Sequence, residues 1–160
     1  MFLLYINDIG ENIVSNIKLF ADDCLLYRSI NSQRDVEILQ EDLNHLIAWS
    51  ERWQMNFNIK KCYELKITRK LSPLVSGYNI KGVALKPVDE HPYLGVHRSK
   101  DLRWNVHVAE ISKKANSTLG FIRRNLGKCS QDVKDKAYKS LVRPDMEYAT
   151  EHGILTPKRI

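Results

Sequence analysis

Residues 17–27 read Ile-Lys-Leu-Phe-Ala-Asp-Asp-Cys-Leu-Leu-Tyr, with the adjacent carboxylates of Asp22 and Asp23 at the centre. The apolar runs on both sides are short and rich in residues that favour strands, and only a brief polar step separates them. The stretch therefore predicts a β-hairpin over residues 16–29, with the two aspartates at or beside its tip.

The two adjacent carboxylates have two interpretations. Two negative charges so close repel one another unless a cation lies near them, and Mg²⁺ is a hard cation that takes oxygen ligands. Asp22 and Asp23 would then be metal ligands. Aspartate is also a common turn residue, so the pair is consistent with a solvated loop as well. From these residues alone, the solvated loop is the commoner explanation.

Length and composition indicate one ordinary globular domain. The chain has 160 residues, of which 43% are hydrophobic and 28% are charged. It is therefore long enough to bury a core, and its composition is that of neither a disordered nor a membrane-spanning chain. The apolar start, Met1 to Ile6, is too short for a signal-peptide core or a membrane span.

The three cysteines, Cys24, Cys62 and Cys129, are widely separated and form no Cys-x-x-Cys pair. They predict a reducing intracellular compartment, nucleus or cytoplasm, and no zinc site. The five histidines show no paired ligand spacing, so we interpret them as structural or surface residues.

The positive charge is concentrated in the C-terminal part of the chain. Residues 1–96 carry 11 Lys and Arg against 12 Asp and Glu, whereas residues 97–160 carry 14 against 7. A basic module beside a module with exposed carboxylates suits a phosphate-rich polymer held near a metal site. The alternative is that the lysine-rich helices simply have solvated faces.

The hydrophobic pattern predicts an α+β fold, a small sheet with a packed helix followed by further helices. Apolar residues at a spacing of three to four predict a helix over about 33–53, capped by Ser32. Residues 62–68 alternate as a half-buried strand does, and further strands are predicted at 78–80, 83–88 and 93–97.

Two helices are predicted in the C-terminal part. The first covers about 105–126, and the second runs from a Ser130 cap to about 142 and ends at a bend at Pro144. The residues of the second helix that we expect to face inward are Val133, Ala137, Tyr138, Leu141 and Val142. Strand signals and charge balance both change near 98–104, which predicts a boundary there.

Several stretches, taken in order, resemble the reverse transcriptases of non-LTR (LINE-type) retrotransposons. The matching stretches are Leu4-Tyr5-Ile6-Asn7-Asp8, Phe20-Ala21-Asp22-Asp23, Trp53-Gln54-Met55, Phe57-Asn58-x-x-Lys61-Cys62, Tyr93-Leu94-Gly95-Val96, Leu102-x-Trp104-x-x-His107, Ala115-Asn116-x-x-Leu119-Gly120-Phe121, Leu141-Val142-Arg143-Pro144 and Glu147-Tyr148-Ala149. Each stretch is short, but their order and spacing make the set specific.

The resemblance implies a partial polymerase palm over residues 1–100, a helical thumb over 101–149 and a divergent tail over 150–160. Asp22 and Asp23 would belong to the palm hairpin that holds catalytic Mg²⁺. Lys61 would lie near the incoming nucleotide, although a lysine in an ordinary turn explains it equally well.

The resemblance also implies contacts with an RNA template and a DNA primer. The candidate residues of the primer-grip region are Tyr93, Leu94 and Gly95, and the thumb candidates for phosphate contacts are Lys113, Lys114, Arg123 and Arg124. Such contacts position a duplex without reading its sequence.

The chain also departs from the family pattern. The palm segment with a further metal-binding aspartate, the glycine-bearing nucleotide-pocket segment and the fingers should all precede residue 1. Pro92 stands where a basic residue is common. We therefore expect an incomplete two-metal site and no polymerase activity from the isolated chain. The alternatives are a non-catalytic module that binds nucleic acid and a decayed retroelement remnant without function.

Overall fold

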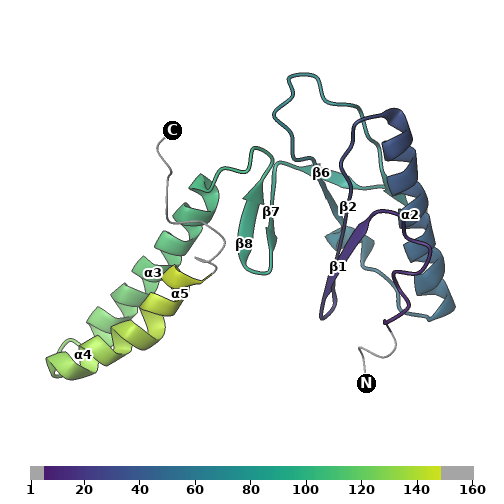
Figure 1. The fold of residues 1–160 in the computed structure, drawn as a ribbon. Helices are drawn as coiled ribbons and strands as arrows, with labels where there is room; N and C mark the ends of the chain where they lie inside the picture. Colours follow the sequence, from purple (N-terminus) through teal and green to yellow (C-terminus); the bar gives the residue numbers. More distant parts are fainter. Residues whose placement is uncertain (1–5, 149–160) are drawn as a thin grey trace. The chain divides into compact units, whose positions relative to one another are not determined.

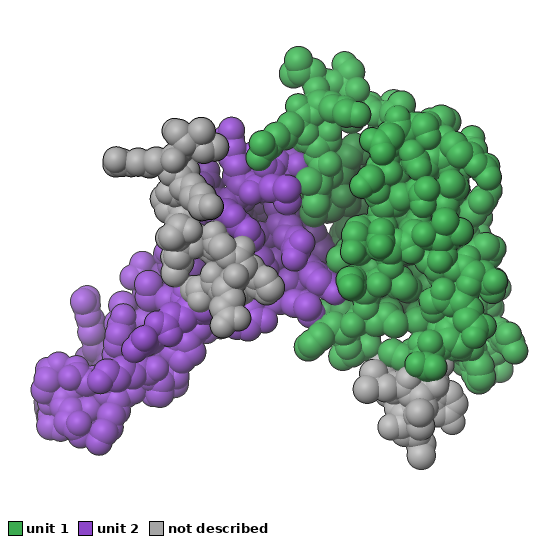
Figure 2. Space-filling model, in the orientation of Figure 1, with its two compact units in different colours: residues 1–88 green, residues 89–160 purple. Residues whose placement is uncertain are grey.

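The computed structural model describes residues 6–148. The chain divides into two compact units, residues 1–88 and residues 89–160 (Figure 2). Leu4, Tyr5, Ala149 and the tail over 150–160 lie outside the described residues. The break between the units precedes the strands of residues 90–99, whereas the sequence pattern predicted a boundary near 98–104. The assignment of the parts to palm and thumb stays a prediction.

Unit 1 begins with the predicted hairpin, which is confirmed (Figure 1). Strand β1 (Asn16–Phe20) pairs antiparallel with β2 (Asp23–Tyr27), and Phe20 lies opposite Asp23. The connection is therefore a two-residue loop, Ala21-Asp22, and Ala21 has φ +50°. Tight loops of this kind need positive φ because only such turns match the right-handed twist of the strands.

Helix α2 (Gln33–Arg52) confirms the predicted helix and its cap. The Ser32 side chain accepts a hydrogen bond from the Asp35 amide at 3.3 Å, and the Asp35 carboxylate accepts one from the Ser32 amide at 3.0 Å. Hydrogen bonds from Asn31, Ser32 and Arg28 lower the pKa of Asp35 to about 2. Each partner satisfies a group that the helix end would otherwise leave unpaired.

The segment before the hairpin is held along α2 by side chains of that helix. Asp42 is 1% exposed, and its carboxylate accepts hydrogen bonds from the amides of Val14 and Ser15 at 2.9 and 2.7 Å. The indole of Trp49 donates to the Asp8 carboxylate at 2.8 Å. These contacts fix the start of β1, and hence the hairpin, to α2.

The rest of unit 1 contains two further pairs of short strands. Strand β3 (Tyr63–Leu65) runs parallel to β6 (Lys86–Val88), and β4 (Asn79–Ile80) pairs antiparallel with β5 (Val83–Ala84). The Gln40 amide binds the backbone of Asn79 through its Nε2 at 3.0 Å and its Oε1 at 2.9 Å, which ties β4 to α2.

Two strand predictions in this unit were wrong in extent. The strand predicted over 62–68 ends at Leu65, because the chain then enters a loop in which Lys66 donates to the carbonyl of Leu74. The strand predicted over 83–88 is two strands with different partners, β5 and β6, separated at Leu85.

Unit 2 begins with a second hairpin, β7 (Glu90–Tyr93) and β8 (Val96–Ser99). The predicted strand over 93–97 was therefore wrong. Leu94 and Gly95 have φ values of +50° and +76°, which reverse the chain between Tyr93 and Val96.

Helix α3 (Asn105–Asn125) follows and confirms the first C-terminal helix. The second predicted helix is divided into α4 (Gln131–Ala137), a π-helical turn η2 (Tyr138–Val142) and α5 (Arg143–Glu147). Its predicted end at Pro144 was wrong, because Pro144 lies in the first turn of α5, where a missing amide hydrogen is tolerated. The Arg143 amide donates to the carbonyl of Tyr138, five residues earlier. The π-turn lies immediately before Pro144, which has no amide hydrogen to donate.

The core of unit 2 lies between α3 and the helices that return along it. Its buried residues are Ala115, Ile122 and Val142, with Leu119, Leu126 and Ala137 packed against them. Val133, Tyr138 and Leu141, which were predicted to face inward, are instead 41%, 42% and 48% exposed. Tyr138 and Leu141 lie within the π-turn, whose wider winding changes the side of the helix that each residue occupies, so a regular 3.6-residue period fails there. Val133 precedes the π-turn in α4, and the turn does not explain its exposure.

The mixture of helices and small sheets confirms the α+β class. No helix among residues 6–148 combines the length and the apolar character needed to cross a bilayer.

We predict that Asp42→Ala lowers the free energy of unfolding by about 3 kcal/mol, because two amides that now bind a buried carboxylate would lose their acceptor. Urea denaturation followed by circular dichroism measures the loss. Glu41→Gln, at the exposed neighbouring position, is the control and should stay within about 0.5 kcal/mol of the wild type. An equal effect of the two substitutions would contradict the anchoring role of Asp42.

Candidate functional site

The tip of the β1–β2 hairpin presents both aspartates to solvent. Asp22 is the second residue of the two-residue loop, and Asp23 is the first residue of β2. Both are exposed, as is the aromatic ring of Phe20, which is 61% accessible. The tip therefore offers two adjacent carboxylates without a covering layer from the described part of unit 1.

Two carboxylates are consistent with part of a divalent-metal site. Mg²⁺ is commonly bound through one or two carboxylates, with substrate phosphates and waters completing its shell. Within residues 6–148, no group of three or more His, Cys, Asp or Glu side chains is arranged to hold a metal ion. Asp22 and Asp23 could thus supply oxygen ligands, while the described residues do not by themselves form a complete cage.

Lys61 belongs to the same unit as the aspartates. It ends the short 3-10 helix η1 (Ile59–Lys61), whose first turn is capped by the Asn58 side chain, and it is exposed. Cys24 follows Asp23 and Cys62 follows Lys61. Burial raises the pKa of Cys24 to about 11, with a smaller contribution from the charge of Cys62. Lys61 and the two aspartates thus belong to the same compact unit.

The predicted primer-grip residues Tyr93, Leu94 and Gly95 form the turn of the β7–β8 hairpin in unit 2. The guanidinium of Arg98 lies 5.9 Å from the centre of the Tyr93 ring, on the facing strand. This cation–π contact partly covers the ring and gives it a structural partner.

The basic candidates on α3 differ in their surroundings. Lys114 forms an ion pair with Asp145 of α5 at 2.7 Å. Among the residues that the structure describes, Lys113, Arg123 and Arg124 have no such carboxylate partner, and all three are exposed. Lys113 and Arg124 are eleven residues apart and share the helix face opposite the buried Ala115 and Ile122. That face is therefore free to contact an anionic polymer.

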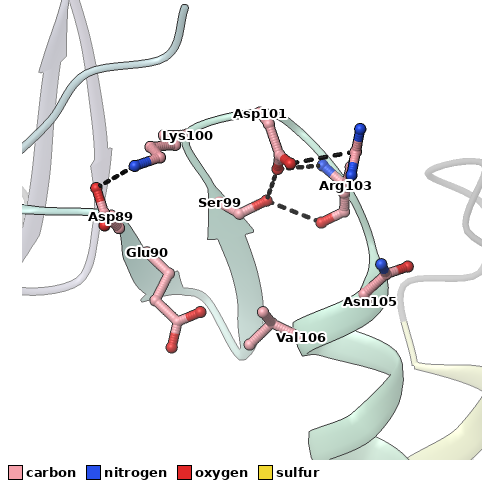
Figure 3. A pocket seen from close by; sticks show the side chains of 8 residues that line it. All are labelled: Asp89, Glu90, Ser99, Lys100, Asp101, Arg103, Asn105 and Val106. Atoms are coloured by element: carbon pink, nitrogen blue, oxygen red, sulfur yellow. Dashed lines mark hydrogen bonds and ion pairs between the residues drawn. The ribbon is translucent and has the colours of Figure 1, made fainter.

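A shallow pocket at the base of the β7–β8 hairpin is not a candidate site, because four of its five charged side chains, all but Glu90, pair with one another (Figure 3). Lys100 pairs with Asp89 at 2.9 Å, and Arg103 pairs with Asp101 at 3.2 Å. The hydroxyl of Ser99 also donates to Asp101 at 2.7 Å, and this bond is the main reason why the pKa of Asp101 is lowered.

Sequence reasoning missed the residues that position these candidates. Asp42 anchors the first hairpin, and its signal was a carboxylate on the apolar stripe of a helix, in line with Leu39 and Leu46. His107 is fully buried, and its Nδ1 accepts the backbone amide of His97 in β8 at 3.3 Å. The general interpretation of the histidines as structural or surface residues included His107 without identifying this contact.

The chain is similar to a class of enzymes from mobile genetic elements, the RNA-directed DNA polymerases. It is 27% identical over 150 residues, 91% of its length, to the RNA-directed DNA polymerase from mobile element jockey of Drosophila funebris. It is 31% identical over 109 residues, 65% of its length, to the probable RNA-directed DNA polymerase from transposon BS of Drosophila melanogaster. The corresponding protein of transposon X-element is 26% identical over 164 residues.

These relatives confirm the resemblance to the reverse transcriptases of non-LTR retrotransposons. The chain spans 16%, 12% and 18% of the length of the three relatives named above. No protein-family model matches the chain, and no solved structure is significantly similar to it.

We predict that His107 makes the stability of unit 2 sensitive to pH. Burial and, to a smaller extent, the charge of His97 lower the pKa of His107 in the folded state. The unfolded chain, with an ordinary histidine pKa of about 6.5, binds the proton more readily, so stability should fall as the pH drops below about 6.5. Protonation of Nδ1 would also remove the acceptor for the His97 amide.

Urea denaturation between pH 7.5 and pH 5 measures this dependence. His107→Asn keeps an acceptor near Nδ1 but does not titrate, so its stability should vary less with pH than that of the wild type. His45→Asn, at an exposed position of α2, should keep the wild-type pH dependence. A wild-type slope in the His107→Asn variant would contradict the prediction.

Proposed function

We propose that this chain is a catalytic and primer-binding part of an RNA-directed DNA polymerase, a reverse transcriptase. The observation that carries the proposal is the pair Asp22 and Asp23, exposed at the tip of a tight hairpin. This pair occurs in a chain that is similar over 91% of its length to such a polymerase. In this proposal unit 1 contributes to the palm, and the helices of unit 2 form the thumb.

The proposed reaction is nucleotidyl transfer. The primer 3′-hydroxyl attacks the phosphoryl group of an incoming nucleotide in line with the leaving group. Asp22 and Asp23 would hold divalent ions, most simply Mg²⁺, and when bound these ions supply electrostatic stabilisation of the entering and leaving oxygens. Lys61, which belongs to the same unit as the hairpin, would interact with the nucleotide phosphates as a point charge.

Unit 2 would hold the duplex of RNA template and DNA primer. The turn with Tyr93, Leu94 and Gly95 would lie against the primer, and the exposed face of α3 would contact phosphates. The charges support this division, since residues 89–148 carry 12 Lys and Arg against 8 Asp and Glu. Phosphate contacts bind a duplex whatever its sequence.

Catalysis would require parts of the polymerase beyond this chain. The chain spans less than a fifth of the relatives named above, and its described residues offer two carboxylates for a centre that needs more ligands. We propose that a preceding palm segment supplies the further aspartate and the nucleotide pocket, and that fingers hold the template. The isolated chain would then be inactive as a polymerase.

We predict that a longer polymerase containing this chain extends a DNA primer on an RNA template in the presence of Mg²⁺. Asp22→Asn should reduce extension at least about 100-fold, because even residues that only support metal ligands commonly contribute 10–100-fold. Glu37→Gln, an exposed carboxylate of α2, is the control. Wild-type extension by the Asp22→Asn enzyme would overturn the catalytic assignment.

A second candidate function, duplex binding without catalysis, is favoured by the unpaired cations of α3. We predict that the isolated chain binds a primer–template duplex with an affinity that falls as salt rises. Replacement of Lys113, Arg123 and Arg124 by Gln should weaken binding. It should also reduce the slope of log affinity against log salt by about 0.9 for each phosphate that the variant no longer neutralises.

The control for this measurement changes the net charge equally at another place. Arg69, Lys70 and Lys86 of unit 1 are exposed, and their replacement by Gln should leave most of the salt dependence intact. Equal losses of affinity in the two triple variants would show a non-specific charge effect and count against a binding face on α3. If the chain binds the duplex at low salt, but a longer polymerase containing the chain does not extend a primer, the non-catalytic function is the better description.

A further inference from the structure

The turn of the β7–β8 hairpin has a strained backbone. Leu94 and Gly95 both have positive φ, +50° and +76°. Glycine adopts this conformation without steric cost, but leucine does not, since its Cβ approaches the following carbonyl. Strained residues persist only where surrounding contacts determine the conformation.

Tyr148, directly after α5, supplies the contact to the turn. Its hydroxyl donates a hydrogen bond to the carbonyl of Leu94 at 2.9 Å, across 54 residues of sequence. Its ring lies against Gly95, because a Cβ placed on Gly95 would be 3.1 Å from the ring atom Cε1. Position 95 thus needs glycine for two separate reasons, the backbone angle and the closeness of the ring.

A second contact holds the same hairpin to α3. Tyr93 and Val96 are the pair that closes the two-residue loop, and Pro92 and His97 form the next pair. In an antiparallel ladder every second pair is not hydrogen-bonded across the strands, so the amide of His97 points away from β7. The outward amide of His97 donates to Nδ1 of the buried His107. The hairpin is therefore attached to α3 through β8 and to the end of α5 through its turn.

We propose that Tyr148 is a positioning residue that sets the place of the Leu94–Gly95 turn relative to the α3 and α5 helices, so that the turn and the α3 face with Lys113 and Arg124 form one rigid surface for a primer–template duplex. The assignment of that surface to a duplex rests on the proposed function. Tyr148 itself does not contact the nucleic acid in this proposal. Its effect on binding is exerted through the turn.

The test compares Tyr148→Phe, which removes only the hydroxyl, with Tyr138→Phe, a matched change at an exposed tyrosine of η2. In NMR spectra of the chain, Tyr148→Phe should shift the carbonyl carbon of Leu94 and accelerate exchange of the Val96 amide about five-fold, the change expected for one neutral hydrogen bond. Tyr138→Phe should leave both signals as in the wild type.

Binding to a DNA primer annealed to an RNA template is measured on the same variants. Tyr148→Phe should weaken the affinity about five-fold and leave the slope against salt unchanged, because every cation that neutralises a phosphate is retained. A double-mutant cycle gives a second measure. Gly95→Ala should weaken binding in the wild type and weaken it less in the Tyr148→Ala variant, since the added methyl group then meets no ring.

The outcomes separate the two proposals. Unchanged Leu94 and Val96 signals in Tyr148→Phe overturn the contact itself. If those signals change while duplex affinity stays at the wild-type value, or if the salt slope falls, the positioning role is wrong although the proposed function stands. If the wild type binds no duplex at low salt, the proposed function fails, and the positioning role fails with it.

Discussion

The position of the candidate metal-binding hairpin depends on the hydrogen bonds that the buried carboxylate of Asp42 accepts. A carboxylate that is 1% exposed has to be matched by donors, and here the donors are the amides of the two residues that precede β1. Because those amides are fixed, the strand that follows begins at a fixed place beside α2. The tip with Asp22 and Asp23 lies one short strand farther on. An exposed pair of charges thus takes its position from a buried one.

In unit 2, too, hydrogen bonds between side chains of other elements and backbone groups hold a hairpin in place, but the side chains are a histidine and a tyrosine. Its second hairpin has too few residues to bury a core of its own, so it is held by polar contacts to the helices, through His107 and through Tyr148. The apolar residues that hold the helices together face inward, while Lys113 and Arg124 lie on the opposite face of α3. The core therefore leaves the basic face available, and the ion pair of Lys114 with Asp145 removes one charge from it.

The predictions of secondary structure from the sequence are correct where a single local pattern determines the element. The 16–29 hairpin has apolar runs on both sides of a short polar step, and α2 and α3 have long apolar stripes with a consistent period. The prediction over 93–97 fails because Leu94, an apolar residue, occupies a turn position with positive φ, which an apolar pattern in the sequence does not reveal. The inward positions at Tyr138 and Leu141 fail because the π-turn before Pro144 alters the period.

The sequence by itself determined the α+β class, the hairpin with two aspartates at its tip, the two long helices and the resemblance to non-LTR reverse transcriptases. These features depend on residues close together in the chain or on motifs in a fixed order. Only the tertiary structure decided which residues hold the hairpins in place, since Asp42, His107 and Tyr148 act on backbone groups 28, 10 and 54 residues away. A hydrogen bond to a distant amide or carbonyl leaves no periodic signal, because any backbone can offer that group.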